Sequence, residues 1–253
     1  MKFVRFSSQD RVAYGLWEGD MIREISGSIF GKFQETSKQH KTSGVRLLAP
    51  VEPTKILCVG LNYRAHIEEL GRSVPELPAH FIKPLTCLIG PDDPIIYPRI
   101  GKFVSYEGEL AVVIKDSIKD IPQAEALKHV LGYTCFNDVT ERTLANVPGQ
   151  LTRAKGFDTF GPCGPCIVPG LDPANTNVQT YLNGKLMQDG NTRDLVFSVP
   201  FLIHYLSQCM TLLPGDIIST GTPRGIHPMN PGDVVEVQVE GIGTLRNGVQ
   251  APR

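Results

Sequence analysis

Short hydrophobic runs separated by turn residues fill the beginning of the chain. KFVRF, RVAYGLWEG and MIREI alternate or are rich in β-branched residues, and Gly-Asp and Gly-Ser pairs lie between them, as expected of strands joined by turns. The polar and then basic stretch from Gly27 to Gly44 predicts a loop or a short helix. VRLLAPVEPTK carries two prolines, which mark a boundary. We predict a small N-terminal β domain over residues 1–50 and a second domain over residues 51–253.

Three later stretches have helical features. AHIEELG comes after the buried run KILCVG and ends at Gly71, a typical helix stop. In IPQAEALKHVLGY, the apolar residues Ala124, Leu127, Val130 and Leu131 fall on one helical face. SVPFLIHYLSQC predicts a further helix, with Ser198 as its N-cap.

The remaining apolar segments are short and are bounded by glycine or proline. HFIKP, PIIYP, YEGELAVVI and DVVEVQVEGIG predict strands, and VQTYLNGKLMQDG predicts a hairpin whose turn is Asn183–Gly184. Strands outnumber helices and do not alternate with them one for one, as they would in a doubly wound fold. We therefore predict a mixed α+β, strand-rich fold.

Composition narrows the class of protein. The chain has 253 residues, 41% of them hydrophobic, and a formal net charge of −1, which fits an ordinary globular protein and excludes disorder as the main state. Near-neutral charge argues against nucleic-acid and membrane-surface partners. No run approaches the roughly 20 apolar residues of a membrane helix, and the N-terminus lacks the pattern of a signal peptide.

Six scattered cysteines indicate buried reduced thiols and not a disulfide framework. A reducing, cytoplasmic location is the simplest expectation. Cys163 and Cys166 have the spacing of a dithiol redox pair, but strand and turn residues come after them where a helix start is needed. No second ligand pair suggests zinc, so two ordinary cysteines in a Gly/Pro loop remain the simpler interpretation.

Three carboxylates are candidate metal ligands. In a strand, Glu107 and Glu109 point to the same face, and two like charges side by side need a cation or a proton between them. Asp138 ends the apolar run GYTCF. Carboxylates without a soft ligand suit Mg²⁺ or Mn²⁺. Two alternatives stay open: the glutamates face water on an edge strand, or Asp138 caps the following helix.

His66 and Glu69 are three residues apart on the predicted helix after KILCVG. That spacing brings an imidazole and a carboxylate together on one helical face, which is the arrangement of a general base that activates water. A surface His–Glu pair is the alternative, and Glu68, which points elsewhere, is an internal control.

Basic residues near these positions are candidates for binding substrate carboxylates. Lys83 lies in HFIKP, Arg142 comes about one helical turn after Asp138, and Lys155 lies in the partly apolar segment TRAKGFDTFGP. Each alone is most often a solvated charge, but together they could bind an anionic substrate.

Eight segments occur together in a family order and spacing. They are KILCVGLNYRAHIEE, HFIKP, YEGELAVVI, GYTCFNDVTER, TRAKGFDTFGPCGP, NGKLMQDGNTRDLVFSV, MTLLPGDIISTGTPRG and GTLRNGV. With them the chain resembles the fumarylacetoacetate hydrolase family over about residues 50–250. It is most similar to the short bacterial branch of 2-hydroxyhepta-2,4-diene-1,7-dioate isomerases, acylpyruvases and oxaloacetate decarboxylases.

The resemblance implies a mixed β-roll and a homodimer with one divalent ion, Mg²⁺ or Mn²⁺, per subunit. The family's metal ligands fall on Glu107, Glu109 and Asp138, and its water-activating pair falls on His66 and Glu69.

The family's substrate contacts fall on four further positions. Lys155 matches the lysine that polarises the substrate, and Lys83, Arg142 and Thr222 match substrate-binding residues.

The implied reaction cleaves a C–C bond of a small anionic 2-oxo acid, by hydrolysis or decarboxylation, through a metal-bound enolate. A tautomerase acting on a 2-hydroxyhepta-2,4-diene-1,7-dioate-type compound in aromatic catabolism is an alternative. A non-catalytic protein that binds a metal or a 2-oxo acid is another.

The segment after the metal aspartate departs from the family pattern. Where many relatives carry a glutamine, this chain has Ala145, in the stretch 143–150 that the resemblance makes a mobile lid. Gln150 could substitute by position. Cys166 stands where a bulky aromatic residue is common. These departures leave the metal site intact and put the exact substrate in doubt.

Overall fold

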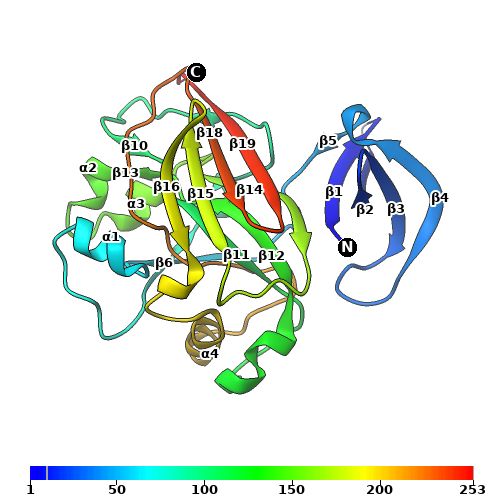
Figure 1. The fold of residues 1–253 in the computed structure, drawn as a ribbon, viewed down its shortest axis with the longest axis horizontal. Helices are drawn as coiled ribbons and strands as arrows, with labels where there is room; N and C mark the ends of the chain where they lie inside the picture. Colours follow the sequence, from blue (N-terminus) through cyan, green and yellow to red (C-terminus); the bar gives the residue numbers. More distant parts are fainter. Residues whose placement is uncertain (10, 253) are drawn as a thin grey trace.

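The computed structural model describes residues 1–9 and 11–252, and β-strands dominate its regular structure (Figure 1). Within the described residues, twelve strands form one mixed sheet, whose main path runs β4-β3-β2-β1-β14-β12-β11-β17-β6-β7. β5 joins this sheet beside β1, and β8 beside β14. Its strands are β1 (Phe3–Ser8), β2 (Arg11–Glu18), β3 (Met21–Gly27), β4 (Phe33–Lys41), β5 (Arg46–Leu47), β6 (Ile56–Gly60), β7 (Ala79–Lys83), β8 (Leu88–Ile89), β11 (Gly108–Ile114), β12 (Val130–Asn137), β14 (Gly161–Val168) and β17 (Ile217–Ser219).

Two smaller sheets complete the strand structure of the described residues. One has the order β16-β15-β18-β19-β9, and the other pairs β10 with β13. Their strands are β9 (Ile95–Ile96), β10 (Val104–Ser105), β13 (Thr140–Glu141), β15 (Asn177–Leu182), β16 (Lys185–Asn191), β18 (Val234–Val239) and β19 (Gly243–Gln250).

Helices are few and mostly short. The α-helices are α1 (Arg64–Glu69), α2 (Arg142–Ala145), α3 (Leu151–Lys155) and α4 (Val199–Cys209). The 3₁₀ turns are η1 (Thr42–Gly44), η2 (Leu85–Cys87), η3 (Gln123–His129) and η4 (Thr192–Asp194). No helix among the described residues is long and apolar enough to cross a membrane. The predicted mixed, strand-rich fold class is confirmed.

The central strand β11 is buried on both faces. Leu110, Val112 and Ile114 belong to one buried cluster, which includes residues of α4, while Ala111 and Val113 belong to another. Because side chains alternate along a strand, Glu109 shares its face with Ala111 and Val113. A strand buried on both sides carries its glutamate into the interior, not to the solvent.

Several sequence predictions are confirmed. The first three predicted strands are β1, β2 and β3, which lie to one side of the main body (Figure 1). β15 and β16 form the expected hairpin, with positive φ at Asn183 and Gly184. α4 begins after Ser198, although the serine side chain makes no capping hydrogen bond. α1 ends before Gly71, which has a φ of +62°.

Two elements differ from the predictions. The expected helix over IPQAEALKHVLGY is the 3₁₀ turn η3 and then strand β12, which begins at Val130. Leu127, assigned to its buried face, is 45% exposed. The three-residue spacing of Leu127 and Val130 also fits a 3₁₀ turn, and the pairing of β12 between β11 and β14 makes the residues from Val130 onward a strand. Residues 27–44 contain the strand β4, whose polar sequence lies at the sheet edge.

The cysteine pair also lies in a strand. Cys163 and Cys166 are buried in β14, not in a loop. Burial raises the pKa of Cys163 to about 12 and that of Cys166 to about 11. A dithiol redox site needs a lowered pKa and an exposed sulfur, so this pair has the properties of structural thiols.

Candidate metal and catalytic site

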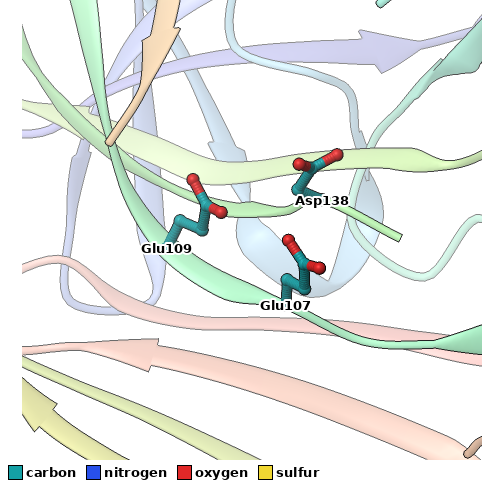
Figure 2. Close-up of side chains that lie close together, drawn as sticks. All are labelled: Glu107, Glu109 and Asp138. Atoms are coloured by element: carbon teal, nitrogen blue, oxygen red, sulfur yellow. The ribbon is translucent and has the colours of Figure 1, made fainter. Parts of the chain in front are cut away.

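The three predicted metal ligands come together where β11 begins and β12 ends. In the antiparallel pair, Gly108 lies opposite Asn137, and the Asp138 N–H donates to the Glu107 carbonyl at 2.9 Å. The ligand oxygens of Glu107, Glu109 and Asp138 all lie within 4.8 Å of one another. Figure 2 shows their carboxyl groups around a common space.

Neither alternative for these carboxylates holds. All three side chains are buried, so the two glutamates do not face water. The residue that caps the following helix α2 is Glu141, whose side chain accepts from the Leu144 N–H at 2.7 Å. Asp138 instead directs its carboxylate into the cluster.

The end of β17 and the residues that follow it hold the site from one side. Ser219 Oγ and the Gly221 N–H both donate to Glu109 Oε2, at 2.5 and 2.8 Å. Thr222 Oγ1 donates to the Gly108 carbonyl at 3.0 Å. Position 221 requires glycine, because its φ is +103° and an added Cβ would lie 2.8 Å from the Asn62 side chain. One short segment thus fixes Glu109 and the backbone between the two glutamates.

A buried glutamine of β16, in the five-stranded sheet, supports the same backbone. Gln188 Oε1 accepts from the Gly108 N–H at 3.0 Å, and its Nε2 donates to Thr222 Oγ1 at 2.8 Å and to the Pro223 carbonyl at 2.7 Å. Gln188 is absent from the predicted site residues, although it lies in the quoted segment NGKLMQDGNTRD. A single polar residue in an amphipathic hairpin carries no signal of its own in the sequence.

Gly108 is expected to tolerate no side chain. A Cβ there would lie 2.0 Å from Thr180 Oγ1, so Gly108→Ala should displace β15 from β11 and cost about 1–3 kcal/mol, the usual range for an overpacked site. Chemical denaturation measures the loss. The double variant Gly108→Ala/Thr180→Ala removes the clashing hydroxyl and should recover most of the stability. An unchanged midpoint in the single variant would contradict the close packing.

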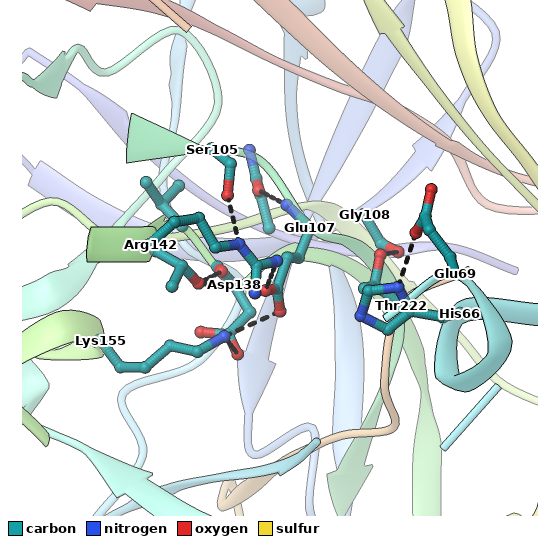
Figure 3. Close-up of polar contacts among 12 residues, drawn as sticks. His66, Glu69, Ser105, Glu107, Gly108, Asp138, Arg142, Lys155 and Thr222 are labelled. Carbon is teal, nitrogen blue, oxygen red and sulfur yellow. Dashed lines mark hydrogen bonds and ion pairs between the residues drawn. The ribbon is translucent and has the colours of Figure 1, made fainter. Parts of the chain in front are cut away.

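Cations surround the three carboxylates. Lys155 Nζ donates to Glu107 Oε2 at 2.8 Å and to Asp138 Oδ2 at 2.6 Å. Arg142 forms an ion pair with Glu107 and donates from Nε to Ser105 Oγ at 3.0 Å. Lys83 is fully buried and donates to Asp138 Oδ1 at 2.7 Å. Figure 3 shows Lys155 and Arg142 converging on Glu107 and Asp138.

The pKa values of the two glutamates are shifted in opposite directions by their surroundings. Burial alone would raise the pKa of Glu107, but Arg142 and Lys155 hold it at about 2. Burial, and then the charges of Asp138 and Glu107, raise the pKa of Glu109 well above its usual range. Burial opposes the charge of Lys155, yet Asp138 and Glu107 raise its pKa. The ionised form of Glu109 therefore lacks a cation within this arrangement.

The donor set fits a hard divalent cation. Three carboxylates with no sulfur or imidazole in the cluster match the oxygen preference of Mg²⁺ and Mn²⁺. A divalent ion beside Glu109 would supply the countercharge that this carboxylate lacks. Its neighbours Ser219 and Gly221 fix the carboxyl orientation in advance, as outer hydrogen bonds do for metal ligands.

His66 and Glu69 lie on α1 and contact each other as the spacing predicts. His66 Nδ1 lies 3.0 Å from Glu69 Oε2, and Glu69 Oε1 accepts from the Gly225 N–H at 3.0 Å. His66 is 4% exposed, whereas the Glu69 side chain is 36% exposed, so the pair joins a buried imidazole to a carboxylate that reaches solvent. With Nδ1 turned to the carboxylate, Nε2 is the ring nitrogen on the side away from Glu69 (Figure 3).

One cavity of about 620 Å³ connects these groups. Its lining includes His66, Glu69, Glu107, Glu109, Arg142, Lys155 and Thr222. Most of the other lining residues are apolar, among them Phe81, Phe103, Leu151 and Ile226. Polar groups that converge in a mainly apolar cavity are typical of a small-molecule site.

Some predicted residues lie outside the cavity lining. The Lys83 ammonium contacts Asp138 and the Val139 carbonyl, so it lies behind the carboxylates and not at the cavity surface. Gln150 precedes α3 and is not among the lining residues, whereas Thr143, Ala145 and Asn146 are.

This fold and this site define an enzyme with a candidate divalent-metal centre. The chain belongs to the fumarylacetoacetate hydrolase family. Residues 55–250 match the model described as Fumarylacetoacetate (FAA) hydrolase C-terminal, and residues 1–50 match the model described as Rv2993c-like, N-terminal.

Two relatives of known structure match this chain over nearly its whole length. The 5-carboxymethyl-2-hydroxymuconate delta-isomerase of Mycobacterium smegmatis is 44% identical, with a TM-score of 0.93 over 99% of this chain and 100% of that one. The maleylpyruvate hydrolase of Sphingobium sp. SYK-6, solved with manganese(II) and pyruvate, is 29% identical, with a TM-score of 0.83 over 100% of both chains.

A bifunctional relative combines two activities. The 4-hydroxyphenylacetate degradation bifunctional isomerase/decarboxylase of Escherichia coli is 43% identical over 77% of this chain and 46% of its own length. Isomerase, hydrolase and decarboxylase activities therefore all occur among relatives of this chain.

Proposed function

We propose that the protein is a Mg²⁺- or Mn²⁺-dependent enzyme that cleaves a C–C bond of a small anionic 2-oxo acid by hydrolysis or decarboxylation. The observation that carries the proposal is one cavity lined by two of the clustered carboxylate ligands and by the His66–Glu69 pair. Glu107, Glu109 and Asp138 would hold the ion. When bound, the ion acts as a Lewis acid that stabilises negative charge on the carboxylate and 2-oxo oxygens of the substrate.

Charge balance supports a dianionic reacting group. With an ion bound, ionised Glu107, Glu109 and Asp138 would carry three negative charges, and Lys83, Arg142 and Lys155 carry three positive ones, so the sum of these six side chains is zero. A divalent ion adds two positive charges. The enolate of a 2-oxo acid carries two negative charges, one on its carboxylate and one on its oxygen, and would neutralise them.

His66 supplies the proton transfers. In hydrolysis of a 2,4-dioxo acid, Nε2 takes a proton from water as the water oxygen attacks the C4 carbonyl. The C3–C4 bond then breaks, its electron pair forms the enolate, and the His66 proton returns to C3. Glu69 fixes the tautomer and stabilises the imidazolium. Decarboxylation of a 2-oxo acid with a C4 carboxyl group releases CO2 and leaves an enolate that needs only a proton at C3. Tautomerisation first needs a proton removed to form an enolate, and then a proton returned at another carbon.

The remaining polar residues orient the substrate. Lys155 and Arg142 place positive charge beside the carboxylate cluster, where charge develops during the reaction. Thr222 lines the cavity and is fixed by Gln188. Lys83 acts on Asp138 and not directly on substrate.

We also propose that the chain forms a homodimer with one ion per subunit, and that its sheets make the β-roll of the family with an N-terminal β domain. The full-length match to the two enzymes of known structure supports the shared fold, and the homodimer follows from the family resemblance.

A tautomerase is the second candidate function. The similarity to the M. smegmatis isomerase favours it, because that enzyme is similar over 99% of this chain. The same enolate and the same histidine serve a proton shift without bond cleavage.

A substrate screen separates these functions. The protein, with Mg²⁺ or Mn²⁺, is expected to remove the ultraviolet enol or diketone band of at least one of oxaloacetate, acetylpyruvate and fumarylpyruvate, and to release pyruvate. A change of the band without fragmentation identifies a tautomerase. Full activity of EDTA-treated protein would contradict the metal's role, and no turnover with tight 2-oxo acid binding would indicate a non-catalytic binder.

A further inference from the structure

Arg72 lies at the candidate active site and has no ion-pair partner among the described residues. It lines the same cavity as His66 and Lys155. Every other charged side chain that lines this cavity has an ion pair or a side-chain hydrogen bond: His66 with Glu69, and Lys155 and Arg142 with Glu107. The Arg72 guanidinium forms no ion pair and no side-chain hydrogen bond with any described residue.

The backbone of Arg72 is held in place by the end of α1. The Gly71 N–H donates to the Glu68 carbonyl at 2.9 Å, and the Arg72 N–H donates to the Ile67 carbonyl at 3.0 Å. With Gly71 at a φ of +62°, these two bonds form a Schellman motif. The same short helix therefore carries His66 in its middle and presents Arg72 just after its last turn.

Apart from its charged residues, the cavity is lined mainly by apolar side chains, among them Leu70, Ala79, Leu151 and Ile226. A hydrocarbon tail would be stabilised there, but a polar group at the end of that tail would need a partner. Arg72 is exposed to solvent, so a carboxylate that meets it stays partly hydrated and its desolvation cost is small.

We propose that Arg72 binds a second carboxylate, at the far end of the substrate, so that the site selects 2-oxo acids with a terminal carboxylate over those with an apolar end. This inference rests on the proposed function, since it assigns the 2-oxo acid head to the carboxylate cluster. The guanidinium presents paired N–H donors that match a carboxylate. Because the contact is exposed, its contribution should fall as ionic strength rises.

Binding of an inert ligand pair tests the assignment without catalysis. 2-Oxoadipate and 2-oxohexanoate have the same head and chain length and differ in a terminal carboxylate against a methyl group. Neither has a carbonyl at C4, so neither is set up for cleavage. In calorimetry with Mg²⁺ at low salt, the protein should bind 2-oxoadipate about tenfold more tightly, as expected of a charge-assisted hydrogen bond.

Arg72→Met should reduce this preference to less than about twofold while the affinity for 2-oxohexanoate stays within twofold. Arg64→Met is the matched control, because Arg64 is an exposed arginine at the start of α1 that does not line the cavity; it should keep the full preference. Equal affinity for the two ligands in the wild type, binding of neither, or a preference that persists in Arg72→Met would each overturn the assignment.

The outcome of the turnover screen, which tests the proposed reaction, does not depend on the outcome of this binding test. If no 2,4-dioxo acid or oxaloacetate is converted but the 2-oxoadipate preference depends on Arg72, the proposed reaction is wrong and the carboxylate site stands. If turnover occurs and Arg72→Met lowers kcat/KM equally for acetylpyruvate and fumarylpyruvate, the reaction stands and the assignment of Arg72 is wrong.

Discussion

Replacing Glu109 by glutamine is expected to reduce metal-dependent turnover by more than about 100-fold, because changing even the outer partners of metal ligands costs 10–100-fold. The substitution removes one anionic ligand from a set of three. Ser219 and Gly221 both donate to the same oxygen of Glu109, so a glutamine carbonyl in that place accepts both bonds. The fold should therefore be preserved.

Thermal unfolding distinguishes a lost metal site from a lost fold. Burial and two neighbouring carboxylates raise the pKa of Glu109, which means that its charged form is unfavourable without a cation. Glu109→Gln should thus leave the Tm of the EDTA-treated protein unchanged or higher. Mg²⁺ or Mn²⁺ should raise the Tm of the wild type, since ligand binding stabilises the native state, and should not raise that of the variant. An equal metal-induced rise in both proteins would show that Glu109 is not a ligand.

Local sequence patterns predicted the parts of this site but not their assembly. The two-residue spacing correctly turned Glu107 and Glu109 toward the same side, although Glu107 lies just before β11 begins. Nothing in either segment shows that Asn137 lies opposite Gly108, which is what brings Asp138 to the two glutamates. The register of two strands depends on packing across the whole sheet, so residue types made the three carboxylates candidate ligands, and the resemblance to a family placed them in one site.

The contacts that distant segments make with this site could not be predicted from the sequence for the same reason. Gln188 reaches Gly108 from a hairpin 80 residues further along the chain, and Lys83 is buried behind Asp138, 55 residues away. A lone lysine after a short strand predicts a solvated charge unless the partner that neutralises it is known. The wrong prediction of a helix over IPQAEALKHVLGY has a related cause. Val130 fits a helical face locally, but its pairing with β11 makes it the start of strand β12.

Replacing His66 by asparagine is expected to lower turnover by about 100- to 10,000-fold, the usual contribution of a general acid–base, while metal binding is retained. The ring lies in the cavity but is not one of the three clustered carboxylate ligands, so the metal-induced rise in Tm should match that of the wild type. Asparagine keeps a polar group at this 4% exposed position, which limits the loss of stability. Glu69→Gln should have a smaller effect, because its carboxyl orients the ring and transfers no proton itself.

Glu68 provides the matched control for both variants. It lies on the same helix between His66 and Glu69, is exposed, and does not line the cavity, so Glu68→Gln should leave kcat/KM within about twofold, as expected of surface changes away from such features. Wild-type turnover by His66→Asn would assign the proton transfers to another group, and the first to replace would then be Lys155, whose buried ammonium lines the same cavity.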